Sequence, residues 1–333
     1  MSESLSHLRV LDLSRVLAGP WAGQILGDLG AEVIKIERPG AGDDTRSWGP
    51  PYMEGTNGKA ELSAYFLTAN RNKQSLAIDI ADPEGQELIR KLVAESDVVL
   101  ENFKVDGLKR YGLDYDSLKR INPKIICCSI TGFGQDGPYA NRPAYDFLIQ
   151  AMGGLMSITG HPNSPPAKVG VPITDLTAGL FAANGVLSAY IHALKTGKGQ
   201  HVDTSLMEAG VAYTVWESSV YFANGEIPGP LGSAHRVSAP YQALRTKDGY
   251  INIGAATQST WEQLCRAIGL EELIDDSRYK SNGDRKMREK ELADLLEETF
   301  CQKTTDEWLE LLEATGVVAG PIYDMAQVYR DPQ

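Results

Sequence analysis

The feature that most constrains the fold of this chain is a regular alternation of short β-rich runs with longer segments of helical period. Five runs in the first half have the aliphatic and β-branched character of strands, at residues 8–13, 31–36, 74–80, 97–100 and 125–130. Strands that alternate with helices are typical of a parallel sheet covered by helices. We therefore expect an α/β protein with a Rossmann-like, doubly wound sheet.

The intervening segments carry their own helix signals. The string DPE at residues 82–84 combines a capping residue, a proline and an acidic residue, in the order that begins a helix, which we extend to about Ala94. Over residues 176–194 apolar side chains recur every three or four positions, and Gly197 is well placed to end that helix. A further strand is expected at 200–206.

The rest of the chain predicts a second, smaller α/β domain. The stretch at 224–233 is rich in Gly and Pro, as linkers are. We place a large domain at 1–224, a linker at 225–240 and the small domain at 241–333. The expected elements of the small domain are a strand at 250–253 and helices at 260–268, 285–300 and 305–314.

Charge and composition disfavour several classes of function. Acidic residues outnumber basic ones by 44 to 32, and the net charge of −12 opposes attraction to nucleic acid or to anionic lipid. The amino terminus has neither the cationic stretch nor the apolar run of a signal peptide, no transit peptide is visible, and we assign no segment as a membrane helix. We expect a cytoplasmic protein, or one of the mitochondrial matrix in a eukaryote, with no nucleic-acid or membrane partner.

The cysteines and histidines give no sign of a metal centre. The four cysteines, Cys127, Cys128, Cys265 and Cys301, form no CxxC pair, and the five histidines are scattered. We therefore expect no metal site and interpret the cysteines as core residues.

The first strand-to-helix junction lacks the glycine pattern of a dinucleotide site. It contains no GxGxxG, and its glycines at 19, 23, 27 and 30 are spaced by four, four and three residues. That spacing places bare backbone along one helix face, which allows close packing on the sheet. An NAD-dependent Rossmann dehydrogenase, with Glu37 on the ribose, is therefore only an alternative hypothesis.

The same junction resembles a known family. The string RVLAGPWAGQILGDLGAEVIKIERPGAGDDTR at 15–46 is similar to the opening motif of the CaiB/BaiF, or class III, CoA-transferases. Later motifs agree in order: NRNKQSLAIDI at 70–80, ENF at 101–103, SITGFGQDGP at 129–138, AYD at 144–146, TDLTAG at 174–179, KTGKGQ at 195–200 and PYQALRTKDG at 240–249. The nearest resemblance is to the succinyl-CoA:glutarate CoA-transferase branch.

This resemblance implies a fold, an assembly and a reaction. The large Rossmann-like domain would be joined to the small domain by a chain that returns at its end, so that two ring-shaped subunits interlock as a homodimer. The reaction would be reversible transfer of CoA from an acyl-CoA, such as succinyl-CoA, to a carboxylic acid, with no cofactor beyond CoA. Because GPIYDMAQVYRDPQ stops where relatives continue, we expect the C-terminal return to be missing from these residues.

Asp175 is the position that matches the family's nucleophile. Taken alone, an Asp just before an apolar helix is most simply interpreted as a helix cap. The resemblance instead implies that its carboxylate carries the acyl group. The two roles are compatible, because backbone N–H groups at a helix start hold a carboxylate and favour its ionised form.

The resemblance also implies a set of CoA contacts. They are Val16, Ala18, Arg38, Ile78, Asn102, Phe103, Arg110 and Tyr145. Guanidinium groups suit the CoA phosphates and an aromatic ring suits the adenine. Exposed arginines are also common as plain surface charges, and a lysine that some relatives place near the phosphates corresponds to Ala81 here.

The acceptor side is expected to be basic. Gly232 and Ser233 are candidates for backbone donors to the oxyanion, although this chain lacks the run of glycines that some relatives have there. Arg15 and His235 are the expected substrate contacts, and the further basic residues are Arg46, Arg142 and Arg236. Such charge suits a dicarboxylic acid. The alternative is that these arginines pair with the chain's many carboxylates.

A second enzyme class shares the family's sequence pattern. The α-methylacyl-CoA racemases use a His/Asp pair for proton transfer, whereas this chain has Tyr145 followed by Asp146. Without an imidazole at that position, we favour the transferase and keep the racemase as an alternative.

Overall fold

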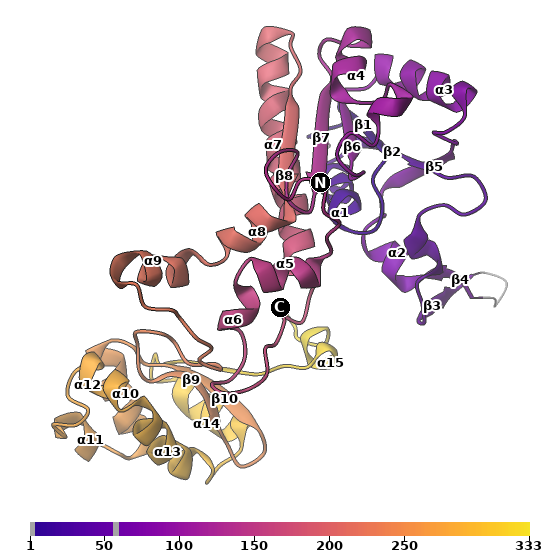
Figure 1. Cartoon of the computed structure of the whole chain (residues 1–333). Helices are drawn as coiled ribbons and strands as arrows, with labels where there is room; N and C mark the ends of the chain where they lie inside the picture. Colours follow the sequence, from indigo (N-terminus) through magenta and orange to yellow (C-terminus); the bar gives the residue numbers. More distant parts are fainter. Residues whose placement is uncertain (1–3, 56–59) are drawn as a thin grey trace. The chain divides into compact units, whose positions relative to one another are not determined.

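The computed structural model describes residues 4–55 and 60–333 and divides the chain into two compact units (Figure 1). The first unit comprises Met1–Ile158 and Pro166–Pro228. The second comprises Gly229–Gln333 together with a short excursion, Thr159–Pro165. The functional residues that concern us most belong to the first unit.

A six-stranded parallel sheet forms the centre of the first unit. Its strands lie in the order β5-β2-β1-β6-β7-β8, with every neighbouring pair parallel. Their bounds are β1 (Arg9–Asp12), β2 (Glu32–Glu37), β5 (Lys73–Ala77), β6 (Val98–Glu101), β7 (Ile126–Thr131) and β8 (His201–Ser205). The strand order reverses direction between β1 and β6, which makes the sheet doubly wound and confirms the predicted α/β class.

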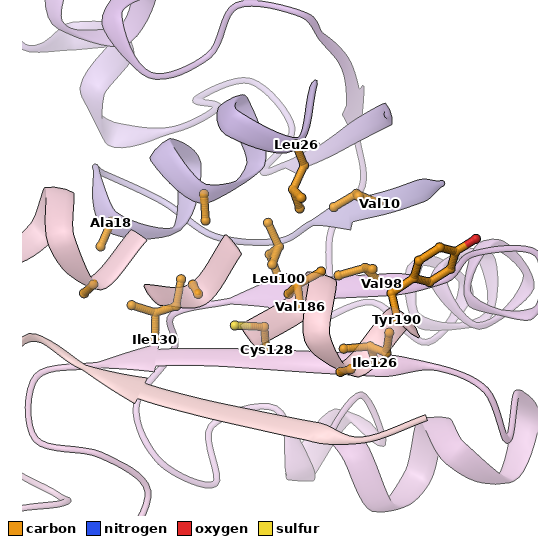
Figure 2. Close-up of a cluster of buried hydrophobic side chains, with 14 of the residues drawn as sticks. Val10, Ala18, Leu26, Val98, Leu100, Ile126, Cys128, Ile130, Val186 and Tyr190 are labelled. Atoms are coloured by element: carbon orange, nitrogen blue, oxygen red, sulfur yellow. The ribbon is translucent and has the colours of Figure 1, made fainter. Parts of the chain in front are cut away.

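Helices cover both faces of this sheet, and the strand sequences show why. Along β6, Val98 and Leu100 belong to one apolar cluster while Val99 belongs to the other, because successive side chains point to opposite faces. The first cluster joins the sheet to α1 (Ala18–Asp28) and α7 (Ile173–Thr196), as Figure 2 shows for Leu26 and Val186. The second cluster is completed by α3 (Pro83–Ala94) and α4 (Tyr115–Ile121).

The glycines of α1 bring that helix close to the sheet, as predicted for three of them. A Cβ at Gly23 would lie 3.0 Å from Asp12 Oδ2 and 3.3 Å from Lys73 Nζ. Gly19 and Gly27 likewise face side chains or backbone of the strands and their loops. Gly30 differs from the prediction: it lies beyond the helix with φ 104°, a conformation that favours glycine.

The helix α7 begins earlier than its sequence pattern indicated. Its first residue is Ile173 and its N-cap is Pro172, so Asp175 lies inside the first turn and makes no cap hydrogen bond. The cap interpretation of Asp175 was therefore wrong. The predicted ends of two helices are confirmed: Gly197 ends α7 in the left-handed conformation, and Asp82 caps α3 by accepting from the N–H of Glu84.

α7 also departs from the expectation about membrane segments. By length and composition it is the one helix among the described residues that is apolar enough to cross a membrane. The buried side of α7 packs on α1 and on β7 and β8, with Ala182 and Val186 fully buried. An apolar helix of this kind is also what the core of an α/β domain needs.

The remaining elements of the first unit surround the carboxyl ends of the strands or lie beyond β8. They are η1 (Asp44–Ser47), β3 (Tyr52–Glu54), β4 (Ala60–Ser63), α2 (Ala64–Thr68), η2 (Lys109–Tyr111), α5 (Asp146–Met152), α6 (Leu155–Ile158), α8 (Leu206–Ala212) and α9 (Val215–Asn224). The antiparallel pair β3 and β4 was not predicted, because both strands are short and β3 begins directly after Pro50-Pro51.

The second unit has its own three-stranded antiparallel sheet, in the order β11-β10-β9. Its strands are β9 (Tyr241–Arg245), β10 (Tyr250–Gly254) and β11 (Val318–Pro321), and its helices are α10 (Gln258–Ile268), α11 (Glu272–Asp275), α12 (Asn282–Met287), α13 (Glu289–Phe300), α14 (Thr305–Glu313) and α15 (Met325–Val328). Trp261, Phe300 and Trp308 lie in its apolar core.

One predicted helix of the second unit is divided in two. The segment 285–300 splits into α12 and α13 at Arg288, which joins the two helices with φ −113°. Arg285, next to this break, is fully buried: its guanidinium donates to the carbonyls of Ala239 and Tyr279 and lies over the Trp261 ring. The helical pattern carries no information about this long-range anchoring.

The cysteines follow the core prediction with one exception. Cys127, Cys128 and Cys265 are buried, whereas Cys301 is exposed, so its assignment to the core was wrong. Burial raises the pKa of the Cys127 and Cys128 thiols far above their usual value. Among the described residues, no group of three His, Cys, Asp or Glu side chains is placed to hold a metal ion.

Candidate active site

A cavity opens where the strand order of the main sheet reverses. The loops that follow β1 and β6 leave the sheet in different directions there, which is where doubly wound proteins bind their ligands. The cavity has a volume of about 540 Å³ and is lined by residues 15–18 after β1, 102–105 after β6 and 140–145 before α5, together with Asp175. All of its lining residues belong to the first unit.

Asp175 is a half-buried carboxylate on the wall of this cavity. Burial raises its pKa to about 7, and the nearby charge of Asp146 adds to the effect. The expectation that the helix start would keep this group firmly ionised was therefore wrong, because desolvation outweighs the helix N-terminus. Near neutral pH the carboxyl group of Asp175 exchanges readily between its two protonation states.

Asp146 fixes the turn that carries Asp175. One oxygen of the buried Asp146 carboxylate accepts from the N–H of Thr174 at 2.9 Å and from its hydroxyl at 2.8 Å. The other oxygen accepts from the Gln150 side chain at 2.7 Å. These bonds join α5 to the first turn of α7, so the backbone next to Asp175 is held by a network and not by Asp175 itself.

A second, smaller cavity adjoins the first. It has a volume of about 150 Å³ and shares Arg15 and Phe103 with the larger one. Two of the predicted CoA contacts, Arg38 and Ile78, line it. Of the other predicted contacts, Val16, Ala18, Asn102, Phe103 and Tyr145 line the larger cavity. The two cavities thus bring seven of the eight together beside or near Asp175.

Arg110 is the exception. It belongs to η2 and lines neither cavity; its guanidinium lies over the Tyr111 ring, 4.5 Å from the centroid. Asn102 lies at the cavity, but its side-chain amide is bonded to the protein. It accepts from the N–H of Arg15 at 2.9 Å and donates to the Arg15 carbonyl at 2.7 Å.

The predicted acceptor residues Gly232, Ser233 and His235 belong to the second unit. The N–H of Gly232 donates to the carbonyl of Gly160 at 2.7 Å, so it is already used. The Ser233 hydroxyl accepts from the N–H of Ala243, and the His235 ring packs on Tyr241.

The basic residues divide into those that are paired and those that face the cavity. The Nε and Nη2 atoms of Arg46 donate to the Glu37 carboxylate at 2.7 and 2.6 Å. Arg236 donates to the Gly229 carbonyl. Arg15 lines the cavity and lies 3.3 Å from Asp44, in an exposed and therefore weak ion pair. Arg142 lines the cavity too, with its guanidinium over the Tyr139 ring.

Glu37 is not available for a ribose. Its two oxygens accept from Arg46, from the Ser75 hydroxyl and from the N–H of Asp43. Burial alone would raise its pKa, but these hydrogen bonds lower it to about 2. With no GxGxxG turn and no free acidic group at this position, the dehydrogenase hypothesis loses its main support.

Several lining residues were not singled out from the sequence. Lys104 adds a cation in the loop after β6, Trp48 adds an aromatic wall, Thr131 is the last residue of β7 and Gly132 follows it. The last two fall within the motif at 129–138, and the ends of parallel strands are where ligands bind. That rule could have identified them and Lys104, but not Trp48, which comes from η1 and its loop.

Comparison with known proteins agrees with this geometry. The model of CoA-transferase family III matches residues 5–333. This chain belongs to that family. A succinate–glutarate CoA-transferase of Agrobacterium fabrum is 43% identical over 99% of this chain and 82% of its own length. The succinyl-CoA:glutarate CoA-transferase of Homo sapiens is 46% identical over 99% of this chain and 74% of its own length.

Solved structures of the family share the fold. A CaiB/BaiF family protein from Brucella suis is 47% identical, with a TM-score of 0.89 over 98% of this chain and 85% of that protein. Rv3272 from Mycobacterium tuberculosis is 32% identical, with a TM-score of 0.87. The chain is therefore a CoA-transferase, as the motifs predicted. Tyr145 stands at the cavity, and no histidine is among the described residues that line it, which leaves the racemase hypothesis without its base.

Proposed function

We propose that this CoA-transferase moves CoA from an acyl-CoA to a dicarboxylic acid through a covalent intermediate on Asp175. The observation that carries the proposal is the half-buried carboxylate of Asp175, in the first turn of α7, on the wall of the cavity at the sheet's switch point. Family members characterised as succinate–glutarate and succinyl-CoA:glutarate CoA-transferases support the choice of substrates.

The first half of the reaction forms an anhydride and then a thioester. An ionised oxygen of Asp175 attacks the thioester carbon of the donor, the C–S bond breaks, and CoA leaves as a thiolate. The thiolate then attacks the carbonyl carbon of Asp175 in the mixed anhydride. The donor acid leaves as its carboxylate, and CoA remains bound to Asp175 as a thioester.

The second half repeats these steps with the acceptor. A carboxylate oxygen of the acceptor attacks the Asp175 thioester and releases the CoA thiolate, which leaves a new anhydride. Attack of the thiolate on the acceptor's acyl carbon gives the product acyl-CoA and restores the Asp175 carboxylate. No oxidation or net proton transfer occurs, so the chemistry needs no cofactor beyond CoA.

The raised pKa of Asp175 fits a nucleophile that works near neutral pH. A carboxylate of higher basicity is a better nucleophile, and a pKa near the working pH keeps a useful fraction ionised. For a dicarboxylic acyl group, the cavity offers Arg15 and Arg142 at its edge as partners for the distal carboxylate. Lys104 adds a third cation to the same cavity.

We further propose that two copies of this chain associate through the exposed apolar residues of α9, a helix with no buried residue. On this one helix Val215 is 73% exposed and Phe222 is 81% exposed, although both are apolar. Exposed apolar groups of this size commonly mark an interface. Light scattering should give the mass of a dimer, and Phe222→Glu should shift it towards that of a monomer.

Asp175→Asn tests the covalent mechanism. It keeps the shape of the side chain and removes the nucleophile, so we expect transfer from succinyl-CoA to glutarate to fall by about a thousandfold or more. The matched control is Asp203→Asn on β8, which also removes a carboxylate whose pKa is raised by desolvation but lies outside the cavity, and should keep near-normal activity. Mass spectrometry of the wild-type protein with acyl-CoA should place an adduct on the peptide that contains Asp175. A folded Asp175→Asn protein with normal turnover would refute the mechanism.

A further inference from the structure

The loop after β1 contains a strained residue at the edge of the larger cavity. Val16 has φ 71°, the left-handed region, which a β-branched residue adopts only when its surroundings impose it. Its neighbour Arg15 lines both cavities, and Val16 lines the larger one. The path of this backbone therefore decides where two of the proposed substrate-binding residues lie.

Three side chains distant in the sequence hold the backbone of this loop from residue 14 to residue 16, in addition to Asp12, which accepts from the N–H of Ser14 at 3.0 Å. Lys35 Nζ donates to the Ser14 carbonyl at 2.9 Å. The Asn102 amide bonds both the N–H and the carbonyl of Arg15. The N–H of Val16 points at the Asp43 carboxylate, at 3.3 and 3.4 Å from its two oxygens. Each consecutive residue thus has at least one backbone group bound by a side chain.

Two of these three side chains are joined in a buried ion pair. Lys35 Nζ lies 3.0 Å from Asp43 Oδ2, and the two side chains are 2% and 0% exposed. Asp43 is itself oriented by the N–H and hydroxyl of Thr45, which donate to its other oxygen at 2.9 and 2.7 Å. The Lys35–Asp43 pair therefore contacts the loop on both sides of Arg15, through Ser14 and Val16.

A buried ion pair of this kind adds little to stability compared with apolar residues of similar size, because desolvating both charges offsets their attraction. The buried ion pair is better explained by a role in holding the loop after β1 in position. Lys35 lies on β2, and the N–H of Asp43 donates to Glu37 on the same strand at 2.8 Å, so contacts within the protein place both residues. They hold the left-handed turn at Val16 before any ligand arrives.

We propose that Asn102, Asp43 and Lys35 are positioning residues for CoA transfer, which clamp the Ser14–Val16 backbone and so place Arg15 and Val16 at the CoA cavity. Asn102 is also a predicted CoA contact, and it lines the larger cavity while its amide is bound to the loop. The part of this inference that concerns substrate affinity rests on the proposed function. The part that concerns the loop does not, because the clamp exists in the free enzyme.

Amide hydrogen exchange of the ligand-free protein tests the clamp without any measurement of activity. Asn102→Ala removes both bonds to Arg15, so we expect exchange in the peptide spanning residues 13–18 to become about tenfold faster, the effect of one lost hydrogen bond. The matched control is Asn122→Ala, since the Asn122 amide also bonds two backbone carbonyls, those of Val93 and Ser96, but lies outside both cavities. It should leave exchange in that peptide unchanged. Unchanged exchange in Asn102→Ala would refute the clamp, and an equal rise in the control would show only general loosening.

Kinetics then test whether the clamp serves the reaction. In Asn102→Ala we expect KM for the acyl-CoA to rise about tenfold with kcat nearly constant, because the loop binds the substrate but does not take part in bond making. Asn122→Ala should leave KM unchanged. A faster exchange with no change in KM would show that the clamp exists but does not serve CoA binding, which leaves the Asp175 mechanism untouched.

A double substitution separates strain from direct contact. Glycine adopts a positive φ without strain, so Val16→Gly should make the turn independent of Asp43. We expect Asp43→Asn to raise KM about tenfold with valine at position 16 and only about twofold with glycine there. Circular dichroism and urea unfolding confirm that each variant is folded. Equal effects in the two backgrounds would show that Asp43 does not act through the backbone of Val16.

Discussion

Two sets of carboxylates in the first unit lie in opposite surroundings. Asp12 and Asp43, beneath the loop after β1, each contact a lysine ammonium, at 2.8 and 3.0 Å. Asp175 and Glu101 have no ion pair in the part of the chain that the structure describes, and burial raises the pKa of each to about 7. The first set holds backbone in place. The second set keeps a proton that can be lost near neutral pH.

The difference shows how the protein separates support from chemistry. Burial alone would raise the pKa of Asp12, but the charges of Lys73 and Lys35 lower it to about 2, so its carboxylate stays ionised over the whole physiological range. A carboxylate fixed in this way is a dependable hydrogen-bond acceptor. Asp175, which lacks a cation, is instead a better base and nucleophile.

The largest expected effect on the free energy of unfolding comes from breaking an ion pair of the first set of carboxylates. Lys73→Met leaves Asp12 buried without its cation, which should lower the free energy of unfolding by about 3–5 kcal/mol in urea denaturation. The matched control is Lys290→Met, because Lys290 and Asp294 form an exposed pair at the same distance of 2.8 Å, and its loss should leave the free energy of unfolding almost unchanged. Adding Asp12→Asn to Lys73→Met should recover part of the loss. Similar losses in the two lysine variants would remove the contrast between buried and exposed pairs.

The second-largest effect is expected at Asp175, where removing the carboxylate should raise the free energy of unfolding at alkaline pH and not lower it. Its folded pKa is raised above that of the unfolded chain, so the folded state binds the proton more tightly and loses stability as pH rises from about 4 to about 7. Asp175→Asn carries no such proton. The variant should therefore be more stable than the wild type at pH 8, and the advantage should shrink steadily as pH falls towards 5. Urea unfolding at a series of pH values measures this, and a constant difference would contradict the raised pKa.

A smaller gain in the free energy of unfolding is expected when the carboxylate of Glu101, at the end of β6, is removed. Its carboxylate is buried but accepts from the N–H of Phe103 at 2.8 Å, and hydrogen bonds from Phe103 and Ser129 offset part of the cost of burial. The groups around it are Asp203, which raises its pKa further, and His201, whose own pKa is lowered by burial. Glu101→Gln should give a slight gain in stability at pH 8 and none at pH 5, by the same unfolding series. A loss at pH 8 would mean that the ionised form is needed to hold Phe103.

Local sequence signals predicted much of the scaffold. Five expected strands lie within a few residues of β1, β2, β5, β6 and β7. The central strands were recognisable because both of their faces need apolar residues, whereas β5 lies at the edge of the sheet and is largely exposed. Asp82 and Gly197 marked helix ends correctly, since capping depends on residues only a few positions away. The strand pattern also indicated the doubly wound sheet, and with it the region where a ligand would bind.

The details of the site depend on contacts that no local pattern reveals. The start of α7 is set by Asp146, which binds Thr174 from 28 residues away. Asn102 reaches Arg15 across 87 residues, so the motif ENF at 101–103 could suggest a functional asparagine but not its partner. The protonation of Asp175 likewise follows from its burial and from Asp146, neither of which is visible in the sequence around it.

The clamp at the loop after β1 binds backbone atoms only, and this has a consequence for how substrate preference can evolve. The amide of Asn102 contacts the N–H and carbonyl of Arg15, groups that every residue except proline provides. The side chain at position 15 is therefore free to change while the course of the loop stays fixed. A library of substitutions at Arg15 should yield folded proteins that keep CoA affinity and differ in the acid they accept, whereas a library at Asp43 should yield few. Single substitutions at position 15 could then change which acid the enzyme accepts without changing the fold of the loop or its affinity for CoA.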